Sequence, residues 1–507
     1  MIVQILIIFI VLWMLVHRWQ RRRMFEIWKQ LKNNYTMLPF IGHAYMFLGS
    51  DEDRMKVFQR LGMEAIERGG IIGLWQGSRL YVMIADPVNA ECVLKTCLEK
   101  DNVMKCSRLL TGNGSVFAPV PIWRPRRKFL APTFSPKNLT HFVSVFSKQS
   151  SVMASNLKKA AGAGTFSIWK YITTYSMDSV CETTLGVKVN AQKQSSLPFL
   201  KAFEEICKMD SARLCQPWLH NDTVYKMVPR YKHYMDYKYT ICNFIDQIIK
   251  SKRKSLEEER EKAEPDQRPD GFKTFLELLI DSSGGEKGYT DVELQEETLV
   301  LVLAGTDTSA VGAAFTTVML SKHQDVQEKV YQELQDVFGD SDRAIVAEDL
   351  PRLKYLEAVI KETLRLYPSA PIIVRRVDRD VKLPFGVTLV RDCGIVVNIW
   401  AIHRNPNFWG DDAEMFRPER FIDTPLKHPA AFMAFSHGPR ACIGYQYAMM
   451  SMKTATAALL RQYRVLPAST GDVMVKEDKN KPIRVKFDIM MKAVDNFAVQ
   501  LRPRFKT

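Results

Sequence analysis

The segment FSHGPRACIG, residues 435–444, constrains the fold of this chain more than any other feature of its sequence. It places Cys442 directly before a run, Tyr445–Tyr463, that is rich in helix formers and carries an apolar stripe. A cysteine at a helix start lies near the positive end of the helix dipole, which lowers the thiol pKa and favours the thiolate that binds metal. Gly438 and Gly444 lack a Cβ, so this loop can approach a flat ligand closely. Taken alone, one of nine cysteines before a helix in a Gly-bounded turn is more often an inert thiol.

The composition predicts one large helical domain. The chain has 507 residues and is 46% hydrophobic, which is enough to bury a large core. No repeat or Pro/Gly/Ser-rich linker divides it, and the charged stretch from Ser251 to Gly271 is predicted to be a solvated loop. The nine cysteines are an odd number without a CxxC pair, which indicates a reducing compartment rather than a disulfide or zinc framework.

The first residues predict a membrane anchor. Ile2–Val16 is apolar apart from Gln4, and four arginines follow within residues 18–23. No basic segment precedes the run and no small-residue cleavage site follows it, which disfavours a removed signal peptide. The positive-inside rule places the arginines in the cytosol. We therefore expect an anchor with its basic stop at 1–23, a linker at 24–44 and the body of the protein at 45–507. The alternative is an apolar helix that packs on the body.

A second informative segment runs from Glu297 to His323. Its apolar residues lie nearly all round a helix, and Thr290 and Asp291 are available as N-terminal caps, so we expect a long buried helix. Residues 305–309, GTDTS, interrupt its apolar surface. Buried without partners, such side chains would each cost about 1–3 kcal/mol.

The polar interruption of this helix has two interpretations. Thr308 follows Ala304 by four residues, so its hydroxyl can bond that carbonyl and loosen the helix, opening a groove for a small ligand. Asp307 beside it can carry protons from solvent. The alternative is a polar patch bonded back to its own helix.

Two further patterns complete the fold prediction. Residues 70–86, 381–390 and 394–404 read as strands with turns at Pro384–Gly386 and Asp392–Gly394, whereas the remainder is mainly helical. In KETLRLYPSAP, Glu362 and Arg365 are three residues apart and share a helix face, so they can pair. The fold class is therefore mainly α, an α+β arrangement with small sheets.

The pattern F-x-x-G-x-R-x-C-x-G around Cys442 resembles the haem-binding signature of the cytochrome P450 superfamily, and AGTDTS resembles its oxygen-activation motif. The resemblance extends over most of the chain. It implies the cytochrome P450 fold, with haem between the long helix and the cysteine loop and with Cys442 as the ligand of the iron. It also implies catalytic roles for Thr308 and Asp307. A thiolate opposite dioxygen favours cleavage of the O–O bond.

The same resemblance implies roles for further residues. The haem propionates would be held by Trp123 and Arg127 in PIWRPRRKFL, by Arg440 and by Arg375, for which the neighbouring Arg376 is an alternative, since arginine suits carboxylates best. The cofactor set is completed by residues of the cysteine loop, namely Phe435, Gly438 and Gly444. Behind the haem, a structural network would join Glu362, Arg365 and Arg420, the last from EMFRPERF.

An apolar pocket is predicted for the substrate, with walls at Phe117, Ala304, Ile372, Ile373 and Val374. The motif sequences are most similar to those of the branch of fatty-acid terminal hydroxylases and their insect relatives. Members of that branch often carry a glutamate that esterifies the haem where this chain has Ala304. We therefore expect haem b without a covalent link, and a lipid, terpenoid, hormone or xenobiotic as substrate.

The chain has no nucleotide-binding motif of its own, so its electrons must come from another protein. The resemblance implies the NADPH–cytochrome P450 reductase, with cytochrome b5 as an additional candidate, and no nucleic acid. The net charge of +15 favours an acidic partner, and Lys128, Lys453 and Arg126 are candidates for its docking face.

The expected location is the endoplasmic reticulum membrane, in contact with membrane lipid, with a single anchor and the body in the cytosol. Two other functions stay open. A haem-thiolate isomerase or dehydratase would act on lipid peroxides without a reductase, but such enzymes often lose the acid–threonine pair. A non-catalytic haem-binding protein would have no need of AGTDTS.

Overall fold

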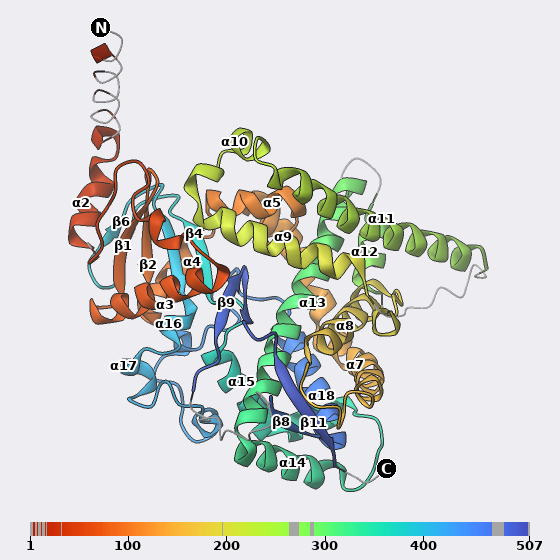
Figure 1. Ribbon diagram of the computed structural model, residues 1–507. Helices are drawn as coiled ribbons and strands as arrows, with labels where there is room; N and C mark the ends of the chain where they lie inside the picture. The colour runs from red at the N-terminus through yellow and green to blue at the C-terminus, as the bar shows by residue number, and fades with distance from the viewer. Residues whose placement is uncertain are drawn as a thin grey trace.

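A computed structural model of the chain describes residues 4, 5, 8, 12, 16, 18–31, 33–194, 196–262, 273–283, 288–468 and 481–504. Helices dominate it, and the larger sheet lies to one side of the helical body (Figure 1). The longer helices are α3 (Asp51–Glu67), α4 (Pro87–Thr96), α6 (Val120–Leu130), α7 (Pro136–Leu157), α8 (Trp169–Val180), α9 (Pro198–Cys215), α11 (Arg230–Lys262), α13 (Asp291–Lys322), α14 (Gln324–Phe338), α15 (Lys354–Leu366) and α18 (Tyr445–Gln462). This arrangement confirms the predicted fold class.

Helix α13 runs through the middle of the body (Figure 1). Thr290 caps it as predicted, because its hydroxyl accepts the backbone N–H of Glu293 while the Glu293 side chain binds the Thr290 N–H. Among the described residues, α13 is the one helix long and apolar enough to span a membrane, and 78% of its most apolar window is buried inside the protein. It is therefore the core helix that the apolar pattern predicts.

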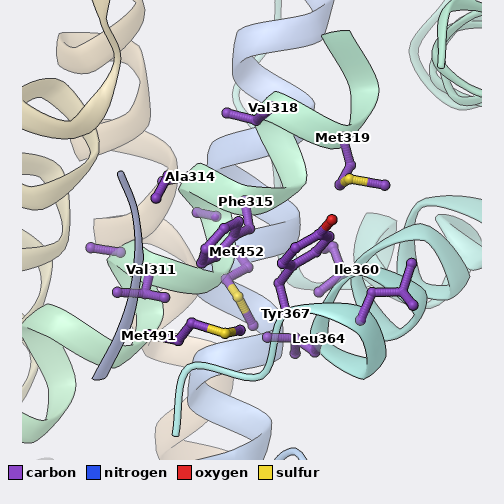
Figure 2. Close-up of a cluster of buried hydrophobic side chains, with 14 of the residues drawn as sticks. Val311, Ala314, Phe315, Val318, Met319, Ile360, Leu364, Tyr367, Met452 and Met491 are labelled. Carbon is purple, nitrogen blue, oxygen red and sulfur yellow. The ribbon is translucent and has the colours of Figure 1, made fainter. Parts of the chain in front are cut away.

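Helices α13, α15 and α18 share one hydrophobic core, part of which Figure 2 shows. The ring of Phe315 on α13 stacks on Tyr367 at 4.9 Å between centroids, and Met452 of α18 and Leu364 of α15 lie beside them. A sulfur-containing side chain fills irregular gaps between helices well. This packing fixes α13 relative to α18, and thereby relative to the cysteine loop that precedes α18.

The larger sheet has the strand order β1–β2–β7–β4, with β1 at Ile71–Gln76, β2 at Arg79–Ile84, β7 at Gly394–Asn398 and β4 at Ile372–Arg376. The pairs β1–β2 and β4–β7 are antiparallel, and β2–β7 is parallel. The predicted strand pattern at residues 70–86 is confirmed and forms two strands. The strand predicted at 394–404 ends at Asn398, because the short helix α16 (Ile399–Ile402) follows it. The segment 381–390 forms the short hairpin β5 (Val381–Lys382) and β6 (Thr388–Leu389).

Two small sheets form at the C-terminal end of the chain. Strand β11 (Ala498–Pro503) pairs with β3 (Phe166–Ser167) and β8 (Tyr463–Pro467). Strands β9 (Val485–Asp488) and β10 (Met490–Ala493) form a hairpin that packs against α3, α9 and α13. This hairpin brings the end of the chain to the central helix.

The N-terminal segment is described only in part. Of the predicted anchor, Ile5, Ile8, Leu12 and Val16 are helical and 45–58% exposed, and most of the other residues before Arg18 lie outside the described ranges. The predicted linker 24–44 begins within helix α2 (Arg22–Gln30), where Phe25 stacks on Trp75 of β1 at 4.5 Å. The first part of this segment is therefore held against the sheet.

The predicted loop at Ser251–Gly271 is wrong for its first half, since α11 continues to Lys262. The sequence there, SLEEEREK, is rich in strong helix formers. Lys254 also lies 3.9 Å from Glu258 in an i,i+4 pair, which stabilises an exposed helix. Residues 263–271 lie outside the described ranges.

Candidate functional site

The site is a cavity of about 320 Å³ between α13 and the cysteine loop. Cys442 and Thr308 both line it. The predicted residues that also line it are Trp123, Arg127, Ala304, Ile373, Arg375, Phe435, Arg440 and Gly444. The fold thus brings together residues from α6, α13, β4 and the cysteine loop, which lie far apart in the sequence.

The cysteine loop is closed by a hydrogen bond from the Cys442 N–H to the Phe435 carbonyl, 2.9 Å. Gly438 has φ +74°, and a Cβ there would lie 2.6 Å from the carbonyl oxygen of Leu94 on α4, so glycine is required by protein packing. At Gly444 a Cβ would meet nothing closer than Phe134, at 3.9 Å. Of the two glycines, Gly444 is the one that borders the cavity and leaves its space open.

The predicted low pKa of the free thiol is wrong. The Cys442 sulfur is accessible, but burial of its surroundings raises the thiol pKa. A backbone hydrogen bond from Gly444 and the charge of Arg127 act in the opposite direction and are weaker. The helix start alone therefore does not ionise this cysteine; a bound cation would have to complete that change.

Four cationic side chains line the cavity, and three of them, Lys100, Arg375 and Arg440, lie close enough to repel one another. Arg375 is only 1% exposed, its Nε has no partner among the described residues, and burial together with Arg440 lowers its pKa to about 9. Burial lowers the pKa of Arg440 to about 10. Burial, with the charges of both arginines, also lowers the pKa of Lys100 well below its ordinary value. Lys100 was not predicted from sequence, because a single lysine among 71 basic residues carries no pattern.

The cavity fits a flat ligand with anionic groups. The Arg440 guanidinium lies 4.6 Å from the ring centroid of Trp123, and Arg127 lines the same wall from the next turn of α6. Buried cations without sufficient counter-charge are costly, and carboxylates would satisfy them. A porphyrin with two propionates, approached by Cys442 from one side, matches this donor set.

Helix α13 forms the opposite wall. The Thr308 hydroxyl donates to the Ala304 carbonyl at 2.6 Å, which confirms the predicted bond, and the Ser369 hydroxyl donates to the Thr308 carbonyl at 2.9 Å. Asp307 is buried on another face of α13 and lies 3.2 Å from Lys492 of β10. Burial raises the pKa of the Asp307 carboxyl, and the charge of Lys492 opposes that rise. The sequence predicts that Asp307 carries protons from solvent, but the Asp307 side chain is buried and is not open to solvent.

The predicted structural network is assembled. Glu362 accepts from Arg365 in a bidentate pair, at 2.7 and 2.8 Å, and from Arg420 at 3.0 Å. Arg365 also donates to the carbonyls of His403 and Ala413. These contacts tie α15 to the segment that leads into the cysteine loop.

The predicted substrate residues separate into two groups. Ala304 and Ile373 line the main cavity, whereas Ile372 and Val374 line a small apolar cavity of about 30 Å³, because neighbouring strand residues point to opposite faces. Phe117 lies beside Lys100, with the ammonium 5.9 Å from its ring centroid.

Sequence reasoning also missed Glu297. It lines the cavity, two turns before Ala304, and accepts from Arg126 at 2.8 Å. The pocket therefore does present charged groups, contrary to the prediction.

Comparison with known proteins agrees with this geometry. The sequence profile of the family described as Cytochrome P450 matches residues 9–491. Cytochrome P450 4c3 of Drosophila melanogaster is 28% identical over 98% of this chain and 93% of that protein. Cytochrome P450 4c21 of Blattella germanica is 32% identical over 84% and 86%, and Cytochrome P450 4V2 of Homo sapiens is 32% identical over 86% and 85%. The chain therefore belongs to the cytochrome P450 family and is a monooxygenase of hydrophobic molecules that uses non-covalently bound haem b.

Proposed function

We propose that this enzyme oxygenates a lipid, terpenoid, hormone or xenobiotic at the endoplasmic reticulum membrane, with electrons from NADPH through a reductase. The observation that carries the proposal is the placement of Cys442 and Thr308 in one cavity, with a group of cations along its wall. The haem, when bound, supplies the activation of dioxygen. Each residue below is assigned its role on that basis.

Cys442 is the proposed ligand of the iron. Trp123, Arg127, Arg375 and Arg440, joined by Lys100, are proposed to hold the propionates, because these side chains surround one cavity and repel one another without an anion. Phe435 and Gly444 border the cofactor space. Glu362, Arg365 and Arg420 are assigned a structural role behind the cysteine loop.

Thr308 and Asp307 are proposed to deliver protons. The Thr308 hydroxyl is held in the cavity wall by its bond to the Ala304 carbonyl. Asp307 is adjacent in sequence but faces Lys492, so a proton reaches it through the protein rather than from bulk water. General acid–base catalysis requires such a group within reach of the reacting atoms.

An acidic reductase is proposed to dock near α6. The outer face of this helix exposes Arg124 and Lys128, four residues apart, while Trp123 and Arg127 face inward. The prediction that Lys453 and Arg126 belong to the docking face is wrong: Lys453 is only 3% exposed and pairs with Glu357, and Arg126 is buried. Cytochrome b5 is proposed as a second partner of the same surface.

Membrane association is proposed from exposed apolar side chains. Ile5, Ile8, Leu12 and Val16 of the first segment are exposed, as are Phe40 and, beside α10 (Asp222–Lys226), Met227. Exposed apolar groups of this kind mark membrane or protein contacts. We retain the predicted division into an anchor at 1–23 and a body at 45–507.

The proposal is tested by replacing Thr308 with alanine. Haem-loaded Thr308→Ala protein, supplied with NADPH and reductase, should still consume NADPH but release most of the reducing equivalents as hydrogen peroxide. The measurement is the ratio of oxygenated product and of peroxide to NADPH consumed.

Thr316→Ala is the matched control for this substitution. Thr316 lies on the same helix and makes the same type of bond, to the Gly312 carbonyl at 2.8 Å, but it does not line the cavity. Its coupling should match that of the wild type. Fully coupled turnover in Thr308→Ala would contradict the role assigned to Thr308.

A further inference from the structure

The C-terminal hairpin of strands β9 and β10 contacts the central helix at Asp307 and reaches its neighbour Thr308 through Ser369. Lys492 of β10 lies 3.2 Å from the Asp307 carboxylate, and both side chains are almost fully buried, at 8% and 5% exposure. Its neighbour Met491 donates its backbone N–H to the Ser369 carbonyl at 2.8 Å, and the Ser369 hydroxyl in turn binds the Thr308 carbonyl. One strand thus contacts Asp307 directly and Thr308 through one intermediate residue.

Lys492 also lies beside a group that connects to the protein surface. Its ammonium is 4.8 Å from the ring centroid of Trp169, and the indole N–H of Trp169 donates to Glu204 at 2.7 Å. Glu204, on α9, is half-buried. The second oxygen of Asp307, Oδ2, has no partner among the described residues. The buried acid therefore has one strong partner and one oxygen free to exchange a proton.

The charges around Asp307 make the ionisation of its carboxyl depend on Lys492. Burial raises the pKa of the Asp307 carboxyl; Lys492 opposes that rise, while Glu204 and Asp488 of β9 add to it. The thiol of Cys207 on α9 also faces this group. Lys492 is thus the cation that keeps the carboxyl able to ionise in a buried, acid-rich setting.

We propose that Lys492 is a positioning residue for proton delivery: it holds Asp307 ionisable and oriented, and so couples oxygen activation to the C-terminal hairpin. This inference rests on the proposed function and extends it to strand β10. Each proton that leaves the Asp307 carboxyl toward the cavity is replaced by another from the side of Glu204. The charge of Lys492 does not change.

The test compares variants of the haem-loaded, full-length protein. Lys492→Met should raise the share of NADPH lost as peroxide severalfold, raise the solvent deuterium isotope effect on product formation about twofold, and move the pH profile of coupling to higher pH. The last shift follows because the carboxyl stays protonated to higher pH once the cation is removed. Lys492→Arg should restore most of the coupling.

The matched control is Lys486→Met. Lys486 lies on β9 of the same hairpin and pairs with Asp488 at 3.6 Å, but its side chain is partly exposed and does not contact α13 residue Asp307. It should leave the coupling and the isotope effect unchanged. A role limited to folding would lower the stability of both hairpin variants without moving the isotope effect.

Lys492→Met leaves a buried carboxylate without its partner, and the protein carrying it can fail to fold. The variants Asp307→Asn and Asp307→Asn/Lys492→Met avoid that charge. If Lys492 acts through Asp307, the double variant should couple as poorly as Asp307→Asn alone, since the two effects are not additive. Additive losses, or normal coupling in Lys492→Met, would overturn the inference. A wild type without thiolate-ligated haem would instead overturn the proposed function.

Discussion

At the scale of single residues, the site is defined by cations that the protein neutralises only in part, since Glu99 acts on Arg440 alone among them. Arg375, Arg440 and Lys100 share one cavity wall, and their lowered pKa values report the cost of that arrangement. The Glu362 network is the opposite case, since each of its charges is paired and hydrogen-bonded. Removing one partner of such a buried ion pair leaves an uncompensated charge and strongly destabilises the folded protein.

Glu362→Gln therefore tests the structural role. The substitution leaves the buried guanidinium groups of Arg365 and Arg420 without their shared carboxylate, and should lower the free energy of unfolding by about 3–5 kcal/mol. Glu414→Gln is the control: Glu414 pairs with Arg404 but is 64% exposed, so its loss should cost about 1 kcal/mol or less. The measurement is the midpoint of unfolding of the haem-loaded proteins. Equal small losses would contradict the assigned role.

At the scale of elements, α9 and α11 meet around a buried acid. Asp210 of α9 is almost fully buried, and burial raises the pKa of its carboxyl to about 7, an effect that Arg213 only partly offsets. Because the folded pKa exceeds the unfolded value of 3.8, the folded state binds the proton more tightly. Its contribution to stability is complete at low pH and is lost as the pH rises from about 4 to about 7.

Asp210→Asn should consequently stabilise the protein in a pH-dependent way. The asparagine cannot ionise, so the gain in unfolding free energy over wild type should be larger at pH 8 than at pH 5, by up to about 1.4 kcal/mol per pH unit between them. The measurement is thermal unfolding of both proteins at the two pH values. Asp222→Asn, which removes an exposed partner of Arg213, should show no such difference. A gain of the same size at both pH values would exclude the raised pKa.

At the scale of the whole molecule, contiguous patterns predicted the elements but not how distant segments meet. The cap at Thr290, the buried helix after it and the strand character of residues 70–86 follow from local sequence, and all three are present. The parallel pairing of β2 with β7 joins Tyr81 to Gly394, and no local pattern signals it. The helical continuation of α11 past Ser251 differs from the predicted loop, because a high density of charge is compatible with an exposed helix as well as with a loop.

The site residues also divide into those that local sequence motifs predict and those that depend on how distant segments meet. Cys442, Thr308 and the Glu362 network lie in short motifs, so the sequence could identify them. The fold places Cys442 and Thr308 on one cavity and pairs Glu362 with Arg365 and Arg420. Lys100, Glu297 and Lys492 are single residues whose meaning depends on the cavity or the acid that they face. Lys453 is predicted to lie on the docking face, because a lysine on an amphipathic helix is usually exposed. In the structure its ammonium is buried against Glu357.

The measurement that tests the central claim most directly is the absorption spectrum of the reduced, CO-bound protein. Wild-type protein should show the red-shifted Soret band of thiolate ligation, and Cys442→His should lose that band while Cys207→Ser, a buried cysteine away from the cavity, keeps it. A colourless wild type, or an unchanged band in Cys442→His, would contradict the assignment of Cys442 as the ligand of the haem iron.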